Sequence, residues 1–277
     1  MTKSIGLITP YTRSITAWVE DAVTGEYLFD CWNVPTIGYR AGGSCRSIEV
    51  MVHDAAHRSE ANVFGVVDRD FRVTNEPHWM DLSQNVRCFI LPAHEIENYS
   101  LDAEALAGCD ANTYRRSPAA IESRMKAKAQ QLVWWMACRR TIKRIDALCV
   151  DGFIDTPSPG AIVDLASAAG HITSHAWFAR FPADSAQIIA AGNVAHWVDE
   201  AQQQYAADLA SDAWKITFAG KRIFHDVRGF IYQPPTQATQ LDYDVDLAKS
   251  VARWQVANNR VPPDITNLLA AFQARAI

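Results

Sequence analysis

Asn62-Val-Phe-Gly-Val-Val-Asp-Arg-Asp70 is the stretch that decides the fold. Its first six residues form an apolar run of strand length, and the charged residues Asp68, Arg69 and Asp70 end that run. Short apolar runs bounded by polar residues are typical of strands buried inside a parallel sheet. The sequence therefore predicts a strand at residues 62–67, with two aspartates directly after its carboxyl end.

Strand-length and helical patterns alternate on both sides of this stretch. We expect further strands at 14–19, 34–38 and 86–91, and helices at 24–32 and 45–57, with Ser44 as the N-cap of the second helix. This β-α-β-α-β order predicts an α/β fold with a mostly parallel sheet flanked by helices.

The second half of the chain has mainly helical periodicity. Ser117-Pro118 places a capping residue before proline at the first helical position, so we expect a long helix that continues to about Val150. Another helix is expected from Val194 to Leu209, with a break before it at 156–160. Gln233-Pro-Pro235 interrupts the chain again, and two short helices are expected to close it. The sheet is therefore accompanied by an additional helical lobe.

The composition favours a folded chain without a membrane segment. Hydrophobic residues make up 49% of the 277 residues, enough for a sizeable core in one large domain or in a core with an added lobe. No apolar run of about 18 residues occurs, and residues 1–16 lack the pattern of a secretory signal. The six cysteines form no Cys-x-x-Cys pair, which is typical of a reduced, cytoplasmic protein.

The charge distribution is uneven. The net charge is −5, but residues 115–144 contain nine Lys or Arg residues and only one acid, Glu122. Such asymmetry indicates either a surface that binds a polyanion or an ordinary solvated helix face.

Acidic residues follow three of the predicted strands. Glu20 follows the first strand, Asp68 and Asp70 follow the strand at 62–67, and Glu95 and Glu97 follow the strand at 86–91. Ligands of parallel α/β sheets bind outside the carboxyl ends of the strands. In an extended segment, Asp68 and Asp70 would point the same way.

Several carboxylates at one sheet edge would repel one another without a cation. Mg²⁺ or Mn²⁺ is the natural counter-charge, because hard cations prefer oxygen ligands. A divalent cation that polarises a phosphate oxygen suits phosphoryl transfer, and Glu20 is the candidate for moving a proton. An Asp-x-Asp pair alone is a weak signal, whereas an acid after each of three strands is more specific.

Three short segments resemble a known family. Val19-Glu20 together with Val66-Val-Asp-Arg-Asp-Phe71 is similar to the toprim domain of type II topoisomerases, bacterial primases and overcoming-lysogenization-defect (OLD) nucleases. Leu91-Pro-Ala-His-Glu-Ile-Glu-Asn-Tyr99 resembles the Glu-Asn-Tyr segment of the OLD-like branch, most of all the toprim effectors encoded beside an ABC-type ATPase in PARIS anti-phage systems. Trp214–Lys221 is similar to the Gly-Lys segment near the end of those proteins.

This resemblance implies a fold, an activity and a partner. It implies a toprim-like core at 1–115, a basic helical lobe at 116–213 and a segment at 214–277 that completes the core. It also implies an endonuclease that depends on Mg²⁺ (or Mn²⁺), cleaves RNA such as tRNA or DNA, and acts in anti-phage defence under the control of an ABC-type ATPase. The implied catalytic and metal-binding residues are Glu20, Asp68, Asp70 and Glu97. Whether the chain forms a homodimer is left open.

The first turn departs from the family pattern. Asp21 stands where toprim proteins usually have glycine, and Thr24 stands where they usually have an acid, with Glu26 two residues later. These differences put the geometry of the turn, and the activity of this chain, in question.

Basic residues are the candidates for contact with nucleic acid: Arg40, Arg69, Arg124, Lys128, Arg139, Lys143 and Lys221. Gly42-Gly43 would admit a phosphate to the backbone or form a plain turn. His94 is a candidate for the surroundings of the site. The pairs His53/His57 and His171/His175 have the spacing of a helical zinc pair but lack an evident third ligand, so ordinary structural roles are favoured.

Two other functions remain open. A glycosyltransferase would use Asp68 and Asp70 to hold a metal and a nucleotide sugar, but it would give Glu20 no role. A non-catalytic subunit would use a toprim-like fold to bind a partner, as the altered turn after Glu20 allows.

Overall fold

The computed structural model describes residues 14–71, 81–83, 86–148, 155–180, 188, 192–233 and 240–276. The chain forms two compact units. The sheet unit consists of Met1–Asp68, Trp79–Leu91 and Ala248–Ile277, and the helical unit consists of Arg69–His78 and Pro92–Leu247. Residues 92–115 and 214–247 therefore belong with the helices, which differs from the predicted boundaries. The reason is a long-range contact, because the short helix after residue 95 and the helix from Gly220 pack on each other.

Four parallel strands form the centre of the sheet unit, as predicted. They are β1 (Ile15–Val19), β2 (Ile37–Ala41), β3 (Val63–Val67) and β5 (Val86–Ile90), and β4 (Asp81–Ser83) pairs with β5 in the antiparallel sense. The order is β2-β1-β3-β5-β4. The carboxyl ends of β1 and β3 are neighbours at one edge of the sheet, because these strands pair directly.

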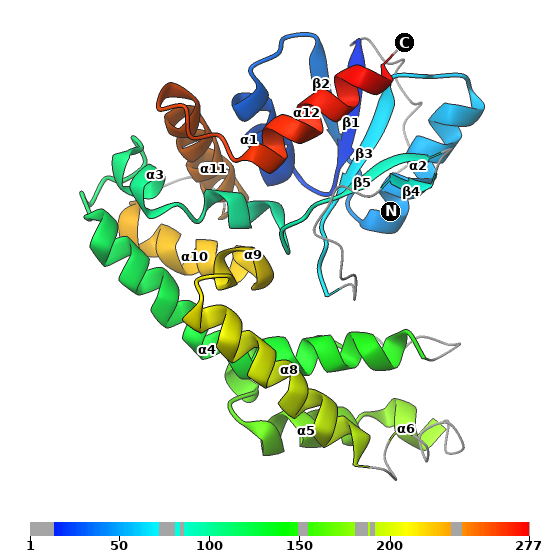
Figure 1. Cartoon of the computed structure of the whole chain (residues 1–277), viewed down its shortest axis with the longest axis vertical. Coiled ribbons are helices and arrows are strands. Elements are labelled where there is room, and N and C mark those ends of the chain that lie inside the picture. Colours follow the sequence, from blue (N-terminus) through cyan, green and yellow to red (C-terminus); the bar gives the residue numbers. More distant parts are fainter. Residues whose placement is uncertain are drawn as a thin grey trace, which may run out of the picture. The chain divides into compact units, whose positions relative to one another are not determined.

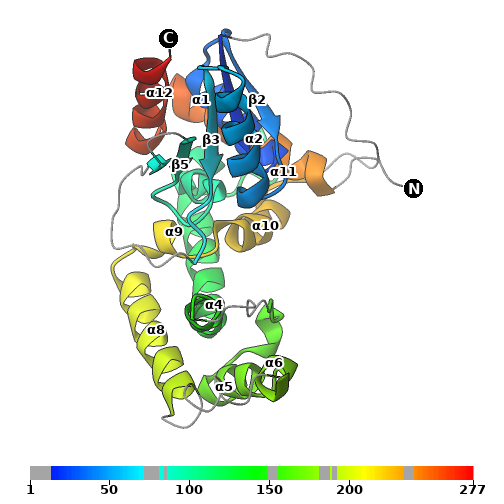
Figure 2. The ribbon, with the colours of Figure 1, turned by 90° about the vertical axis from the view of Figure 1, so that its right-hand side faces the viewer.

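Helices cover both faces of this sheet (Figures 1 and 2). Ile48 and Val52 of α2 (Cys45–His57) pack in a core cluster with Val67 of β3. Side chains alternate along a strand, so Phe64, three residues before Val67, faces the other way. There its ring stacks on Phe272 of α12 (Pro263–Arg275), with the ring centroids 4.6 Å apart.

Local capping explains where the helices of the sheet unit begin. Ser44 caps α2 as predicted, because its side chain accepts a hydrogen bond from the backbone N–H of Ser47. Asp21 caps α1 (Ala22–Trp32) by accepting from the N–H of Thr24 at 2.9 Å. Strand β2 begins three residues later than predicted, because the N–H of Ile37 first closes a turn onto the carbonyl of Val34.

The helical unit is built around α4 (Pro118–Asp146), the long helix that the sequence predicts. Ser117 caps it by accepting from the N–H of Ala120 at 3.3 Å. Among the elements that the structure describes, four other helices pack against α4: α3 (Ala103–Gly108), α5 (Leu165–Thr173), α8 (Asn193–Ala210) and α10 (Gly220–Ile231) (Figure 1). The unit also contains η1 (Ile96–Ser100), η2 (Pro159–Ala161), α6 (Ala176–Arg180) and α9 (Trp214–Thr217).

The last two helices are longer than expected. Helix α11 (Gln240–Ala257) has 18 residues and α12 has 13, whereas the sequence predicts two short helices. Most of the break predicted at Gln233-Pro-Pro235 lies outside the described residues. In the part of the chain that the structure describes, no helix has both the length and the apolar character needed to span a membrane.

Candidate metal centre

Two carboxylates and one imidazole meet in the helical unit. One ligand atom from each of Asp70, His94 and Glu95 lies within 4.8 Å of the other two. Within the described residues, this is the one group of three such side chains close enough to share a metal ion. The three residues come from two loops that are distant in the sequence, after β3 and after β5.

The backbone brings the two loops together. Asp70 has φ of 49°, in the left-handed region, and its N–H donates to the carbonyl oxygen of His94 at 2.9 Å. Asp68-Arg69-Asp70 is therefore not an extended segment, in which the two carboxylates would point the same way, because β3 ends at Val67 and the chain turns at Asp70. Asp68 belongs to the sheet unit and Asp70 to the helical unit.

His94 has the chemical state that a metal ligand needs. Its side chain is buried, and burial together with the nearby Arg69 and Arg139 lowers its pKa to about 3, so the ring is neutral. Among the described residues, Nε2 of His94 has no hydrogen-bond partner. A buried nitrogen that lacks a partner is costly, and a metal ion would satisfy it.

Glu95 lies at the N-terminus of η1 and is also partly buried. Burial raises its pKa to about 7, although the N–H of Lys221, which donates to Glu95 Oε2 at 2.7 Å, acts in the opposite direction. The negative charge of Asp70 raises the pKa further. Without a cation, the two carboxylates therefore repel each other, and a divalent cation would remove that repulsion.

Asn98 fixes the conformation around Glu95. Its Oδ1 accepts from the N–H of Glu95 at 2.8 Å, and its Nδ2 donates to the carbonyl of Phe218 at 2.9 Å. Gly220 packs directly against it, since a Cβ atom at Gly220 would lie 2.6 Å from Asn98 Oδ1. The Glu-Asn-Tyr and Gly-Lys segments, about 120 residues apart in the sequence, are thus in contact.

Glu97 lies outside the cluster of three ligands. Its side chain is buried, and Oε1 lies 3.8 Å from Nζ of Lys221. The family resemblance implies that Glu97 is a metal ligand. In the structure it is Glu95, and not Glu97, that lies in one cluster with Asp70 and His94. His94 had been considered only as a neighbour of the site. The signal that identifies His94 and Glu95 was their position shortly after residues 86–91, the last strand of the predicted sheet.

A pocket of about 350 Å³ opens beside the two carboxylates. Acids and cations line it together, which is an arrangement suited to a metal and an anion. The charged or polar residues that line it are Asp70, Glu95, Arg139, Thr156, Lys221, Arg222 and His225.

Arg139 is positioned at this pocket by hydrogen bonds from one of its nitrogens. Its Nη1 donates to the hydroxyl of Thr156 at 2.6 Å and to the carbonyl of Asp155 at 3.1 Å. Its guanidinium lies over the ring of Phe71, 5.1 Å from the centroid. Burial lowers the pKa of Arg139, and the negative charge of Asp70 opposes that effect. The group remains a cation at neutral pH, because an arginine has a very high ordinary pKa.

Glu20 and Asp68 lie close together in the sheet unit. Glu20 Oε1 accepts from the N–H of Asp68 at 3.2 Å, as expected for residues that follow adjacent parallel strands. The turn at Gly42-Gly43 supports this edge, because its two N–H groups donate to the carbonyls of Val19 and Glu20. These N–H groups are therefore engaged within the fold, which favours the plain-turn interpretation over phosphate binding.

The unusual residues after Glu20 have structural roles. Asp21 is the cap of α1 and also accepts from the hydroxyl of Thr24 at 3.0 Å. Glu26 accepts from the hydroxyl of Tyr39 at 2.8 Å and pairs with Lys249 at 3.0 Å. Burial alone would raise the pKa of Glu26, but these two partners lower it below the ordinary value.

The other predicted nucleic-acid contacts have varied surroundings. Arg124 forms a two-pronged ion pair with Asp226, and Lys143 pairs with Asp146 at 3.3 Å. Arg69 is partly buried, and burial lowers its pKa. Arg40 lies over the ring of Trp18, 5.8 Å from its centroid. Lys128 is half-buried on α4. Several of these charges are therefore compensated within the protein.

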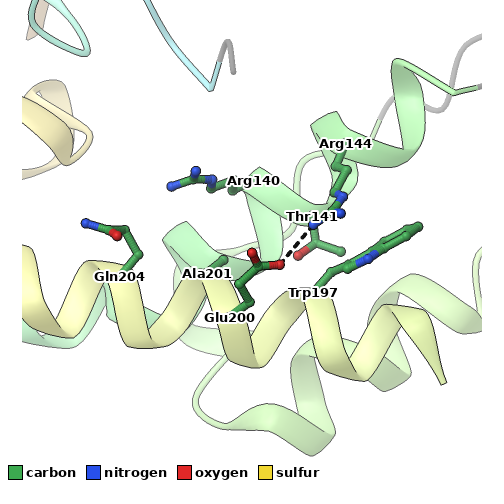
Figure 3. A pocket seen from close by; sticks show the side chains of 7 residues that line it. All are labelled: Arg140, Thr141, Arg144, Trp197, Glu200, Ala201 and Gln204. Atoms are coloured by element: carbon green, nitrogen blue, oxygen red, sulfur yellow. Dashed lines mark hydrogen bonds and ion pairs between the residues drawn. The ribbon is translucent and has the colours of Figure 1, made fainter. Parts of the chain in front are cut away.

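A second pocket, of about 360 Å³, lies between α4 and α8 (Figure 3). Arg144 points across it, forming an ion pair with Glu200 at 3.0 Å and lying 4.4 Å from the ring centroid of Trp197. Arg140 and Gln204 also line it. Because the charge of Arg144 is paired inside this groove, the pocket beside Asp70 is better suited to an anion.

The two histidine pairs have other contacts. The rings of His53 and His57 meet edge to face with centroids 4.3 Å apart. Nε2 of His171 lies 2.5 Å from Oδ2 of Asp155.

Comparison of the whole chain with protein-family models and with curated proteins finds no match. The functional interpretation therefore depends on the residues themselves.

Proposed function

We propose that this chain is a metal-dependent nuclease of the toprim type, in which Asp70, His94 and Glu95 hold a divalent cation. The observation that carries the proposal is the cluster of two carboxylates and one neutral imidazole, with ligand atoms within 4.8 Å of one another. The buried Nε2 of His94 supports it, because the chain provides no hydrogen-bond partner for that atom among the described residues.

The surroundings of the cluster favour a phosphodiester as the substrate. Lys221, Arg222 and Arg139 line the same pocket and would bind phosphate oxygens, while the carboxylates alone would repel them. The bound cation would polarise a phosphate oxygen and lower the pKa of a coordinated water. The protein supplies the positions of these charges and a partly buried environment, which strengthens electrostatic interactions.

The donor set favours Mn²⁺ over Mg²⁺. Carboxylates suit both ions, but an imidazole ligand shifts the preference towards transition metals. We therefore expect Mn²⁺ to support higher activity than Mg²⁺ at equal concentration.

The resemblance to toprim effectors supplies the broader part of the proposal. Glu20 and Asp68, which lie together in the sheet unit, are acids required for cleavage in this proposal. The substrate is RNA such as tRNA, or DNA, and an ABC-type ATPase partner controls the activity in anti-phage defence. The close contact between the Glu-Asn-Tyr and Gly-Lys segments supports this assignment, since both segments carry the resemblance.

The test is cleavage of a panel of tRNA, single-stranded RNA, plasmid DNA and linear DNA with Mn²⁺ or Mg²⁺, with and without the ATPase. Glu95→Gln and Glu20→Gln keep the size of the side chain and are expected to lower the cleavage rate by about a hundredfold or more. Asp110→Asn is the matched control, because Asp110 is exposed and does not line the pocket.

The outcomes separate the competing functions. Activity that survives Glu20→Gln but not Glu95→Gln would exclude a role for Glu20 and would favour the glycosyltransferase alternative if a nucleotide sugar were consumed. If the folded chain cleaves nothing in any arm and still binds the ATPase without metal, the proposal is wrong and a non-catalytic partner-binding role replaces it.

A further inference from the structure

His225 is a pocket residue that the proposed metal site leaves unused. It lies on α10, where its spacing of three and four residues from Arg222 and Lys221 places the three side chains on one helix face. All three line the pocket beside Asp70 and Glu95. In the described part of the helical unit, the ligand cluster comprises Asp70, His94 and Glu95 and does not extend to His225.

A buried carboxylate lies beside one nitrogen of the His225 ring. Nδ1 of His225 lies 3.2 Å from Oδ1 of Asp244, which comes from the first half of α11. Asp244 is only 6% exposed. Nη1 of Arg228 donates to the same Oδ1 at 2.6 Å, so the carboxylate is fixed from a second direction.

This arrangement separates the surroundings of the two ring nitrogens of His225. The distance of 3.2 Å from Nδ1 to Asp244 is that of an ion pair, and Nδ1 has no hydrogen-bond partner among the described residues, so Asp244 acts on the ring through its charge. Because Nδ1 lies beside Asp244, Nε2 is the nitrogen that we assign to proton exchange with a ligand of the pocket that the ring lines.

We propose that His225 is the general acid of the cleavage reaction and that Asp244 is its positioning residue. The proposal rests on the proposed nuclease function. Water forms a new bond to phosphorus and releases a proton to solvent, while the bond between phosphorus and the leaving oxygen breaks. The proton on Nε2 of His225 moves to that oxygen, which leaves as an alcohol, and the imidazole regains a proton from solvent.

Other groups of the pocket are less suited to this step. Asp70 and Glu95 would be ligands of the cation, which favours their ionised forms. Arginine does not lose its proton in proteins, and a lysine ammonium is ordinarily a weak acid near neutral pH. Histidine alone among these side chains ordinarily exchanges a proton in that range. The charged groups that face His225 are Asp244 and Arg228, together with Asp70, Glu95, Arg139, Lys221 and Arg222, which line the pocket.

The test compares two substrates that differ in their need for an acid. When an oligonucleotide is cleaved, the oxygen of the departing fragment leaves as an unstable alkoxide unless an acid protonates it. In contrast, p-nitrophenolate is a stable anion that leaves without a proton. With Mn²⁺, we expect His225→Ala to slow oligonucleotide cleavage by about a hundredfold or more. The loss on thymidine 5′-p-nitrophenyl phosphate should be far smaller, and added imidazole should restore part of the oligonucleotide rate.

Two further variants make the result specific. Asp244→Asn should show the same dependence on the leaving group with a smaller loss, because the ring remains but no longer lies beside a negative charge. His196→Ala is the matched control, since His196 is exposed on α8 and does not line the pocket. Circular dichroism melting of each variant checks that it is folded.

The outcomes distinguish this step from the nuclease proposal itself. If the unaltered chain cleaves neither substrate, the proposed function fails and this step fails with it. If the unaltered chain cleaves both and His225→Ala cleaves the oligonucleotide equally well, only the assignment of His225 is wrong. Equal losses on both substrates, without rescue by imidazole, would also overturn it, because they indicate a role in binding or folding.

Discussion

Glu95 shows how one side chain connects the stability of the protein to its site. Burial and the charge of Asp70 raise its pKa from 4.5 to about 7, so the metal-free protein holds an acid that resists ionisation. Such a residue destabilises the folded state wherever it must be ionised. Groups at functional sites often have this property, because a ligand compensates for it.

Glu95→Gln is therefore expected to stabilise the metal-free protein at high pH. Below pH 4.5 the Glu95 carboxyl is protonated in both the folded and the unfolded wild-type protein, so the substitution adds no stability through this group. As the pH rises from 4.5 to about 7, the unfolded chain releases this proton before the folded chain does, so wild-type stability falls relative to the variant. The gain above pH 7 is at most about 3 kcal/mol. Urea unfolding in EDTA at pH 5 and pH 8 measures it, and a difference that does not change with pH would contradict the argument.

The cysteines provide a second prediction at the residue scale. Burial raises the pKa of Cys31 and of Cys138 to about 12, so neither forms a reactive thiolate near pH 8. Cys45 is only partly buried. In a Cys149→Ser background, iodoacetamide should label the peptide that contains Cys45 first, as read by mass spectrometry. Equal labelling rates for Cys31 and Cys45 in the folded protein would refute this.

Gly220 gives the corresponding prediction at the scale of the element. An alanine at 220 would place its Cβ 2.7 Å from the backbone nitrogen of Asn98, which is too close for any native contact, so α10 or η1 must shift. We expect Gly220→Ala to cost about 1–3 kcal/mol of stability and to weaken metal binding, since Asn98 holds the N–H of Glu95.

Gly229 is the matched control on the same helix. A Cβ atom there meets nothing within 4 Å, so Gly229→Ala should stabilise α10 by roughly 0.5–1 kcal/mol through helix propensity. Thermal melting and Mn²⁺ titration of both variants test the pair. Equal effects of the two alanines would show that the contact with Asn98 is unimportant.

Local sequence signals were sufficient to predict most elements. Ser44 and Ser117 are capping residues whose effect depends only on their neighbours, so the starts of α2 and α4 were predicted correctly. Strand β2 was displaced because the turn at Val34 to Ile37 is not evident from apolar periodicity. The left-handed backbone at Asp70 depends on a hydrogen bond to His94, which is distant in the sequence.

At the scale of the whole molecule, long-range contacts were decisive and could not be predicted. The sequence places acids after three strands, but it does not state which of Glu95 and Glu97 faces Asp70. The short helix η1 decides this, because it places Glu97 in the interior beside Lys221 and leaves Glu95 at the helix start. The division of the chain into two units likewise depends on packing between η1 and α10, far apart in the sequence.

Metal binding should be visible in the stability of the whole chain. A ligand that binds only the folded state stabilises it in proportion to the logarithm of its concentration, by about 2.7 kcal/mol at one hundred times its dissociation constant. We expect Mn²⁺ to raise the melting temperature, and Asp70→Asn or His94→Ala to abolish that increase. Asp110→Asn, an exposed acid away from the cluster, should leave it intact. If Mn²⁺ still raises the melting temperature of both Asp70→Asn and His94→Ala, the ion binds at another site. That conclusion would hold whether or not the chain cleaves nucleic acid.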